Sequence, residues 1–514
     1  MSLLKLLSSV DTSTKSKLLG EHTTRLLRYT FAKSEEDSLP AKALDRALAY
    51  SLGEKMVRTK KNRGILLDSV RVSVFKALGH QSFQEGHAFY IRNLEKFIRD
   101  FEIEEEFTIS RKIDERTNSQ VVLPIYGECN GVNAFLHDYQ YQLKVSITPA
   151  LLANFRPNLL VTMPTGAGKT ILGMEVIVDF LRVNVGQLAN TSICWVVDSK
   201  ELCEQSLQSF QKIWKQKGDH PVAAQRFFSR FDDLGCNDIP TVTFASFDLL
   251  VSRLTTDDVD GFLSDLDLLV IDEAHSSNAS TYRRVISQYE RSSATARILG
   301  LTATPFRNDD EVNVNLKSMF KKYIRIECSE DEFMSPIQYL QKGGYLAEIN
   351  FETISHSERS LNLFGFYNSL HSSVLKHCNT LCRNGENIII FAESKSHAIC
   401  LSIYLGDNGV ENGLIIGETS DPLRKSYISR FGDNSDSLNV LVNHQILSTG
   451  IDVPGMNAIM ILSRIESPSL ALQVLGRAMR GPENGGNATN KVFLTKENHI
   501  KMEQYNILEN LVLK

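Results

Sequence analysis

The residues from Val161 to Thr170 read Val-Thr-Met-Pro-Thr-Gly-Ala-Gly-Lys-Thr, and this stretch predicts the fold of the chain around it. The short apolar run 158–161 predicts a buried strand before the glycines, and apolar residues at helical spacing in 171–181 predict a helix after them. A strand, a glycine loop and a helix in that order present backbone N–H groups at a helix N-terminus. Because these donors and the helix dipole both favour an anion, we predict a phosphate-binding loop.

The side chains of this loop suit a nucleoside triphosphate with Mg²⁺. The amine of Lys169 would reach the outer phosphates, and the hydroxyl of Thr170 would bind the Mg²⁺ ion. The general pattern of such loops opens with Gly, whereas this chain has Met163 at that position. Nucleotide-driven motors commonly relax that first glycine, so the departure indicates a subclass. A purely structural turn is the alternative for the loop taken alone.

Two adjacent carboxylates follow a second buried strand. The apolar residues 268–271 predict the strand, and Asp272 and Glu273 stand at its end. Carboxylates in that position would be costly to bury unless they bind a cation or move a proton. We predict that Asp272 holds the Mg²⁺ shell and that Glu273 polarises the attacking water. The hydroxyls of the later strand end 302–307 could bond His275.

A face of positive charge is predicted near the end of the chain. The helix expected at 469–479 brings Gln473, Arg477 and Arg480 together, because they lie at four- and three-residue spacing. Guanidinium groups that point the same way need an anion or water. We predict arginine fingers that reach a phosphate across a cleft. A surface salt-bridge face is the alternative.

Length and composition predict a soluble protein of about three domains. The chain has 514 residues and a formal net charge of −5, which neither announces nor excludes a nucleic-acid partner. No apolar run approaches the ~20 residues of a membrane span. The opening stretch 1–7 is too short for a signal peptide. Eight cysteines in a chain of this length predict no disulfide framework, so we expect a reducing, cytoplasmic location and no membrane partner.

Residues 1–128 predict a mostly helical N-terminal accessory domain with a small sheet at its end. The helices are expected at 14–31, 41–57, 65–78 and 83–101, and the paired strands at 106–113 and 120–125. Between two helices lies a basic cluster formed by Arg58, Lys60, Lys61 and Arg63. It could contact phosphate or an acidic partner, although a solvated loop is the more usual role of a short charge run.

The rest of the chain alternates strands with helices, which predicts parallel sheets covered on both faces. We expect a first lobe at 129–307, a linker at 308–345 and a second lobe at 346–514. Hydroxyls at the predicted strand ends, such as Ser199 and Ser246, could hold a nucleic-acid backbone or cap the helices that follow.

Four motifs occur in the order found in the superfamily 2 helicases. They are the phosphate loop 161–170, Asp-Glu-Ala-His at 272–275, Thr-Ala-Thr at 302–304 and Gln-x-x-Gly-Arg-x-x-Arg at 473–480. The chain resembles this family from about 130 to 500. The resemblance implies an α/β fold with two tandem RecA-like domains, ATP in the cleft between them and nucleic acid across the top.

The resemblance also assigns roles to individual residues. Gln140, whose amide can pair with the adenine edge, would read the base. The residues expected to bind ATP and Mg²⁺ are Thr165, Gly166, Ala167, Gly168, Lys169, Thr170, Asp272, Gly450 and Asp452. The residues expected to act in catalysis are Lys169, Asp272, Glu273, Gln473, Arg477 and Arg480. The residues expected to contact the strand backbone are Ser199, Ser246, Ser394 and Thr449.

Within the family, the stretch 302–307 and the stretch 335–346 ending Gly-Gly-Tyr-Leu resemble the XPB, RadD and type III restriction-motor branch. That branch acts mainly on DNA. RadD-like proteins carry a cysteine-bearing C-terminal extension, whereas this chain ends at Lys514, so we look for specificity in the N-terminal domain.

We therefore expect an ATP-dependent helicase or translocase on single-stranded or forked DNA, with a role in repair, restriction or antiviral defence. One alternative is an ATP-gated clamp that switches a partner nuclease through the N-terminal domain. The other is an RNA helicase.

Overall fold

The computed structural model describes the elements of two α/β lobes and an N-terminal helical module. The residues that it describes are 3–31, 39–104, 119–124, 136–153, 158–184, 191–234, 238–274, 279–293, 296–303, 319–327, 335–357, 363–431, 438–444, 453, 455–505 and 507. Among these residues, no helix is long and apolar enough to cross a bilayer.

The first lobe is built on an eight-stranded sheet with the order β1-β4-β5-β3-β6-β7-β2-β8. The strands are β1 (Gln120–Leu123), β2 (Leu159–Thr162), β3 (Ser192–Val197), β4 (Val222–Phe227), β5 (Thr241–Ser246), β6 (Leu268–Ile271), β7 (Ile298–Thr302) and β8 (Lys322–Arg325). Every neighbouring pair is parallel except β1 with β4. The parallel α/β architecture predicted from the alternating pattern is confirmed.

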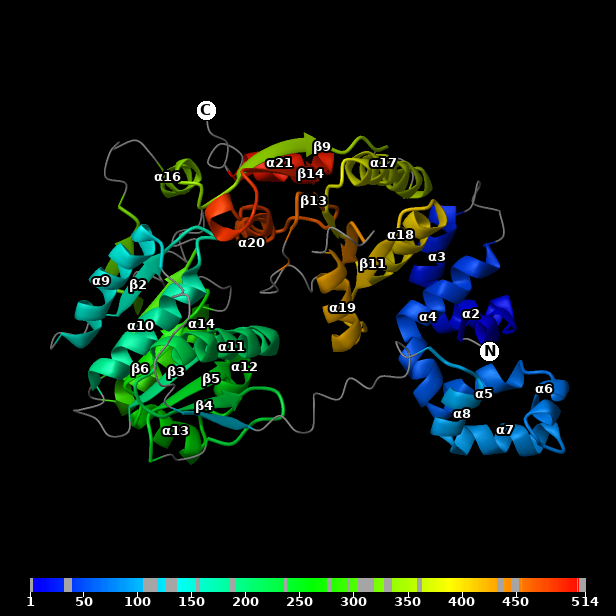
Figure 1. Ribbon diagram of the computed structural model, residues 1–514, viewed down its shortest axis with the longest axis horizontal. Helices are drawn as coiled ribbons and strands as arrows, with labels where there is room; N and C mark the ends of the chain where they lie inside the picture. The colour runs from blue at the N-terminus through cyan, green and yellow to red at the C-terminus, as the bar shows by residue number, and fades with distance from the viewer. Residues whose placement is uncertain are drawn as a thin grey trace.

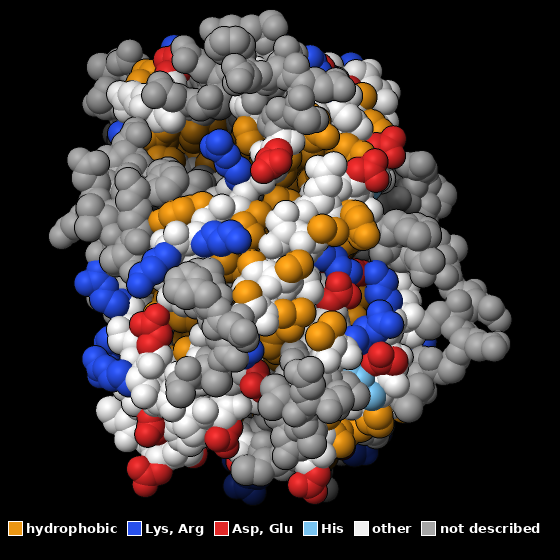
Figure 2. All heavy atoms as spheres, turned by 90° about the vertical axis from the view of Figure 1, so that its left-hand side faces the viewer, with side chains coloured by type: hydrophobic (Ala, Val, Ile, Leu, Met, Phe, Trp, Pro, Cys, Tyr) orange, Lys and Arg blue, Asp and Glu red, His pale blue; other side chains and the backbone are white. Residues whose placement is uncertain are grey.

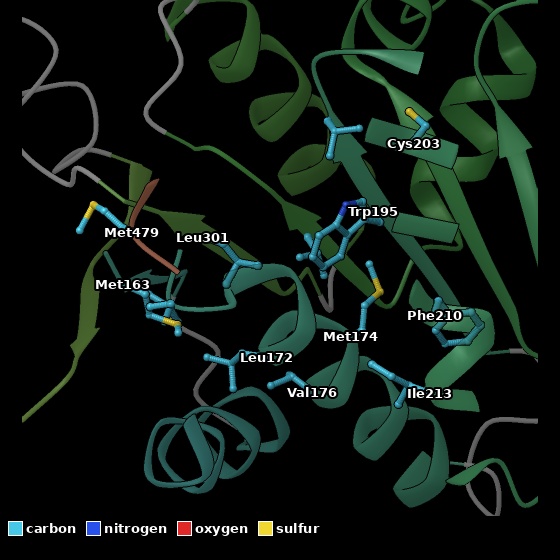
Figure 3. Close-up of a cluster of buried hydrophobic side chains, with 14 of the residues drawn as sticks. Met163, Leu172, Met174, Val176, Trp195, Cys203, Phe210, Ile213, Leu301 and Met479 are labelled. Carbon is cyan, nitrogen blue, oxygen red and sulfur yellow. The ribbon is translucent and has the colours of Figure 1, made fainter. Parts of the chain in front are cut away.

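Helices cover both faces of this sheet. They are α9 (Asp138–Leu152), α10 (Lys169–Asn184), α11 (Lys200–Lys217), α12 (Phe247–Ser252), α13 (Asp257–Ser264) and α14 (Ala279–Ser292). Successive residues of β3 serve opposite faces, as a pleated strand requires. Trp195 packs against α10 and α11 (Figure 3), whereas Cys194 and Val196 belong to the core that contains residues of α12, α13 and α14. Gly173 of α10 allows the close approach of the indole, because a Cβ there would lie 2.7 Å from Trp195 Cη2.

Helix α9 packs through one face and leaves the other exposed. Its buried residues Tyr139, Leu143, Ile147 and Leu151 recur every four positions, which gives one stripe along the helix. Figure 2 views the molecule from the side on which α9 lies in Figure 1, and orange hydrophobic side chains are visible across this face. The exposed side of α9 contributes large apolar residues, including Tyr141.

The second lobe is a six-stranded, fully parallel sheet with the order β11-β12-β10-β13-β14-β9. Its strands are β9 (Glu348–Thr353), β10 (Ile388–Phe391), β11 (Asn412–Ile415), β12 (Val440–Asn443), β13 (Ala458–Ile461) and β14 (Thr489–Leu494). The short helix α16 (Pro336–Lys342) precedes its first strand. The helices that follow are α17 (Leu363–Arg383), α18 (Lys395–Asp407), α19 (Asp421–Phe431), α20 (Pro468–Ala478), η3 (Pro482–Asn484) and α21 (Lys496–Gln504). This lobe repeats the architecture of the first.

The N-terminal module contains more and shorter helices than the sequence predicted. They are α1 (Leu3–Ser8), α2 (Thr12–Leu19), α3 (Glu21–Phe31), α4 (Ala41–Arg58), α5 (Lys60–Asp68), α6 (Val72–Ala77), α7 (Phe83–Arg92) and α8 (Leu94–Asp100). The helix predicted at 14–31 is divided because Gly20 adopts φ +81°, a conformation that ends α2. The predicted strand 106–113 lies outside the described residues.

Two strands belong to the first lobe although the sequence placed them elsewhere. The strand predicted for the small N-terminal sheet is β1, and it pairs antiparallel with β4 at the edge of the first-lobe sheet. The predicted linker 308–345 contains β8, which pairs with β2 at the opposite edge. Short strands at a sheet edge have weak local signals, so their partners were not readable from the sequence.

In the described part of the chain, the N-terminal module shares a hydrophobic core with the second lobe and not with the first lobe that follows it in sequence. Figure 1 shows the blue helices beside the yellow and orange helices α17 to α19. Leu26 and Leu27 of α3 share one hydrophobic core with residues of α17 and α18. At the same contact, the ring of Tyr29 stacks on Tyr367 with centroids 6.2 Å apart. The module and the second lobe therefore form one packed unit.

The basic cluster of the module is not a solvated loop. Lys60, Lys61 and Arg63 lie in α5, and Arg63 is buried. The Arg63 guanidinium donates from Nε to the carbonyl of Tyr90 (3.0 Å) and from Nη1 to the carbonyl of Val57 (2.7 Å). Arg63 thus ties α4 to α7 and is not available to an external phosphate.

Candidate nucleotide site

The predicted phosphate loop connects β2 to α10, and its backbone is held open by glycine. Gly166 and Gly168 have φ values of +84° and +78°, which favour glycine over other residues. Lys169 and Thr170 begin α10, so the N-terminus of a 16-residue helix follows the loop. The strand, loop and helix predicted from the sequence are confirmed, and the arrangement can bind a phosphate through its N–H groups.

The side chain of Gln140 holds this loop through a hydrogen bond to its backbone. Its Nε2 donates to the carbonyl of Ala167 (2.9 Å), and the hydroxyl of Tyr139 donates to the same carbonyl (2.9 Å). Gln140 Oε1 accepts from the backbone N–H of His137 at 3.0 Å. Because both ends of this buried amide are engaged by the protein, Gln140 shapes the loop in this conformation. Its predicted contact with adenine stays a prediction.

The predicted lysine, threonine and carboxylates come together at the end of the sheet. Lys169 Nζ lies 3.6 Å from Glu273 Oε1, and the Thr170 hydroxyl donates to Asp272 Oδ2 at 3.4 Å. Burial, and secondly the charge of Glu273, raises the pKa of Asp272 above its usual range. A divalent cation would reverse that effect, because it stabilises the ionised carboxylate. The donor set of a hydroxyl and a carboxylate therefore fits Mg²⁺.

Glu273 has a strained backbone, with φ +52° in the left-handed region. Such a conformation costs about 1–3 kcal/mol for a residue with a side chain, and it is most often kept at functional sites. The N–H of Glu273 donates to Asp272 Oδ1 at 3.0 Å, which helps to hold this turn. The Glu273 carboxylate lies near Lys169, whereas that of Asp272 lies near the Thr170 hydroxyl.

The second lobe closes this site with the residues that the sequence singled out. A cavity of about 470 Å³ lies between the lobes, and its walls include Lys169, Asp272 and Glu273 from the first lobe. From the second lobe, Gln473, Arg477 and Arg480 line the same cavity. Ser467 accepts a hydrogen bond from Leu470 N–H, which fixes the start of α20, the helix of Gln473 and Arg477. Arg477 and Arg480 thus line the same cavity as the phosphate loop.

Glycine allows the two lobes to approach closely here. A Cβ on Gly476 of α20 would lie 1.9 Å from Thr165 Cγ2 in the phosphate loop. A Cβ on Gly166 would lie 3.4 Å from the carbonyl of Gly476. The glycine of the motif at 473–480 is therefore at the interface between the lobes.

Sequence reasoning missed a junction of aromatic and amide side chains beside the cavity. His137 Nε2 and Asn484 Oδ1 are 2.8 Å apart, and the Asn484 amide donates to the carbonyl of Tyr345 (2.8 Å). The Tyr345 ring lies 4.9 Å from that of Tyr139, centroid to centroid. These residues join the start of α9 to the second lobe. Only the Gly-Gly-Tyr-Leu stretch was noticed, because residues far apart in sequence build this junction.

Of the residues predicted to contact nucleic acid, three lie at the start of helices and one lies outside the described residues. Ser199 caps α11 by accepting from Leu202 N–H, and Ser394 caps α18 by accepting from His397 N–H. Ser246 stands at the start of α12 and is buried. The remaining predicted positions outside the described residues are Thr449, Gly450, Asp452, His275 and 304–307.

Two family models match the stretches of sequence that build this site. The model for the res subunit of type III restriction enzymes matches residues 133–307, and the helicase conserved C-terminal domain matches residues 371–482. The first contains the phosphate loop and the paired carboxylates, and the second contains the glutamine and arginine face. The chain belongs to helicase superfamily 2.

Known superfamily 2 proteins resemble this chain over parts of their length. The proposed ATP-dependent helicase IRC3 of Saccharomyces cerevisiae is 24% identical over 333 residues, 62% of this chain and 46% of IRC3. The ATP-dependent DNA helicase MPH1 of Debaryomyces hansenii is 30% identical over 202 residues, 39% of this chain and 17% of MPH1. The chain spans about half the length of the first relatives that it matches.

A solved structure shares the fold. The fragment of an HsdR subunit of a type I restriction enzyme from Vibrio vulnificus YJ016 superposes with a TM-score of 0.52 at 16% identity. The match covers 83% of this chain and 72% of that fragment. This similarity shows the shared fold. The match to the model for the res subunit of type III restriction enzymes fits the restriction-motor-like branch of superfamily 2 that the sequence predicted.

Proposed function

We propose that the chain hydrolyses ATP between its two lobes and uses the cycle to move or separate strands of nucleic acid, with DNA as the substrate. The single observation that supports this most is the shared cavity. Its walls carry the lysine and carboxylates of one lobe and the two guanidinium groups of the other. Such a division of charge suits a triphosphate that binds both lobes at once.

Each side chain has a distinct task in this proposal. Lys169 neutralises the outer phosphates, while Thr170 and Asp272 hold Mg²⁺, which when bound screens the phosphate charge. Glu273 orients the attacking water and accepts its proton. Arg477 and Arg480 stabilise the negative charge that develops on the transferred phosphoryl group. Hydrolysis then weakens the attraction between the lobes and lets them separate.

The names of similar proteins favour DNA over RNA as the substrate. MPH1 is named a DNA helicase, and the res and HsdR subunits belong to restriction enzymes. An RNA substrate stays the alternative. The predicted cytoplasmic location and the repair, restriction or defence role also stay predictions.

The test measures ATP hydrolysis with single-stranded, duplex and forked DNA and with the matching RNAs. We expect single-stranded or forked DNA to stimulate the rate, and Lys169→Ala to lose nucleotide binding. Glu273→Gln should bind ATP yet hydrolyse it about 10²–10⁴ times more slowly. Equal rates with and without any nucleic acid would contradict coupling, and stronger stimulation by RNA would transfer the proposal to RNA.

A clamp that recruits a partner protein is the second candidate, and the position of the N-terminal module favours it. Because the module shares a core with α17 and α18 of the second lobe, nucleotide-driven lobe motion would carry it and any protein bound to it. Strand displacement and triplex displacement separate the candidates. A clamp would hydrolyse ATP without displacing either kind of strand.

A further inference from the structure

A second cavity lies where the N-terminal module meets the second lobe, away from the nucleotide site. Its volume is about 250 Å³. Residues 49–55, 58 and 59 of the module form one wall. Leu414 and Ile416, the turn 418–420 and residues of α19 form the other wall. We call this contact between the N-terminal module and the second lobe the seam. Both of them form the walls of the cavity, so a ligand bound there would contact both.

Two helices begin at this cavity with a hydroxyl residue whose side chain does not cap the helix. Thr59 precedes the nine-residue α5, and its carbonyl accepts from Arg63 N–H, yet its side chain makes no capping bond. Ser420 precedes the 11-residue α19, and its carbonyl accepts from Arg424 N–H. The N-termini of helices attract anions through their unpaired N–H groups and dipoles.

The hydroxyl of Ser420 is the decisive group. Ser420 is only 5% exposed and lines the cavity, and its Oγ has no hydrogen-bond partner among the residues that the structure describes. The neighbouring Thr419 differs, because its hydroxyl accepts from Ile416 N–H and donates to the carbonyl of Leu414. A buried hydroxyl without a partner costs about 1–3 kcal/mol, so a ligand that accepts its hydrogen bond would recover that energy.

Salt bridges around the cavity leave one lysine available to an anion. Glu54 pairs with Arg58 at 3.3 Å, and Glu418 pairs with Lys395 at 2.6 Å, so each acidic wall residue is balanced. Lys55 is exposed at the rim and pairs with no carboxylate among the described residues. The lining itself holds two cations and two carboxylates, and Lys55 is the cation that stays available to an anion. The apolar side chains of Leu423 and Tyr427 complete the wall, which leaves room for an organic group beside the anion.

We propose that this cavity binds the phosphate group of a phosphorylated ligand, with Ser420 as hydrogen-bond donor and Lys55 as counter-charge. The same chemistry serves a nucleic-acid strand that continues from the second lobe onto the module, or a small phosphate compound. Binding of a nucleic-acid strand at this cavity rests on the proposed function, whereas binding of a small phosphate compound does not.

The test is a pair of binding titrations in a Lys169→Ala background, which removes the phosphate-loop lysine. Inorganic phosphate is followed by ³¹P line broadening, and a labelled oligothymidylate is followed by fluorescence anisotropy at low salt. We expect Lys55→Glu to weaken binding about tenfold, and Ser420→Ala about fivefold. Lys55→Glu should also lower the slope of log K against log salt for the oligonucleotide by about one. Lys76→Glu, an exposed α6 lysine off the cavity, is the matched control.

Each outcome decides between the sources or against the site. Loss of oligonucleotide binding in both variants identifies a strand phosphate, and loss of phosphate binding alone identifies a small ligand. Unchanged titrations, or an equal loss in Lys76→Glu, would overturn the proposal. Thermal melting shows that the variants fold. The proposed function is tested separately by stimulated hydrolysis in the wild-type protein, so the two can fail independently.

Discussion

Replacing Gly476 with alanine should separate the stability of the protein from the closure of its lobes. In α20, alanine is favoured over glycine by about 1 kcal/mol, because glycine loses more backbone entropy in a helix. A Cβ at this position would, however, lie 1.9 Å from Thr165 Cγ2 and 2.7 Å from Thr165 Cβ. The first effect stabilises the second lobe by itself. The second effect acts only where that lobe meets the phosphate loop.

The interface effect should dominate the activity. Overpacking of this kind costs about 1–3 kcal/mol, which lowers the population of the closed arrangement about 5- to 150-fold. Because Thr165 Cβ is close to the backbone, the side chain cannot rotate out of the clash. We therefore expect kcat/KM for ATP to fall at least about fivefold in Gly476→Ala, with little loss in thermal stability.

Gly261→Ala is the matched control. Gly261 also lies within a helix, α13, and a Cβ there would meet no atom within 4 Å. This substitution should raise stability by about 1 kcal/mol and leave ATP hydrolysis unchanged. The assay is steady-state hydrolysis with thermal melting of both variants. If Gly476→Ala kept the wild-type kcat/KM, the contact between α20 and the phosphate loop would play no part in turnover.

Three further substitutions test the roles of Arg477, His371 and Arg63. Arg477→Ala should lower the hydrolysis rate about 10³-fold or more while nucleotide still binds, measured by single turnover; a rate within tenfold of wild type would exclude a finger role. Burial, and then His397, holds the pKa of His371 well below its ordinary 6.5, so the unfolded chain takes up this proton first. The contribution of His371 to the free energy of unfolding is then fully present above pH 6.5 and falls by up to about 1.4 kcal/mol per pH unit below it. His371→Gln should flatten the curve of unfolding free energy against pH in this range. Arg63→Leu leaves the carbonyls of Val57 and Tyr90 without their donor. We expect the free energy of unfolding to fall by about 2–4 kcal/mol. A fall of less than about 0.5 kcal/mol would contradict the structural role of Arg63 between α4 and α7.

The chemistry of the site was readable from the sequence because it depends on local order. A strand followed by glycines and Lys169 determines its own turn, and helical spacing places Gln473 and Arg477 on one face whatever the partner. The packing of Gln140 was not readable in this way. Its amide bonds Ala167, 27 positions away, and no local pattern distinguishes an amide that supports a loop from one that meets a ligand.

The lobe on which the N-terminal module packs was not readable from the sequence for a related reason. Helix periodicity shows which face of α3 is apolar but not which body will cover it, and the module precedes the first lobe in the chain while packing on the second. The edge strands β1 and β8 show the same limit, because each is completed by a partner distant in sequence.

This packing decides how the role of the module can be measured. Deleting residues 1–104 would expose the surfaces of α17 and α18 that now lie against Leu26 and Leu27, and buried apolar surface exposed in this way favours association. A truncated protein that lost activity would therefore report damage to the second lobe as readily as loss of a partner. Single substitutions at the rim of the seam avoid this problem, since Lys55 is exposed and contributes little to the core. If Lys55→Glu changed the response to nucleic acid while basal hydrolysis and melting stayed at wild-type values, the module would act through its surface and not through the support that it gives to the second lobe.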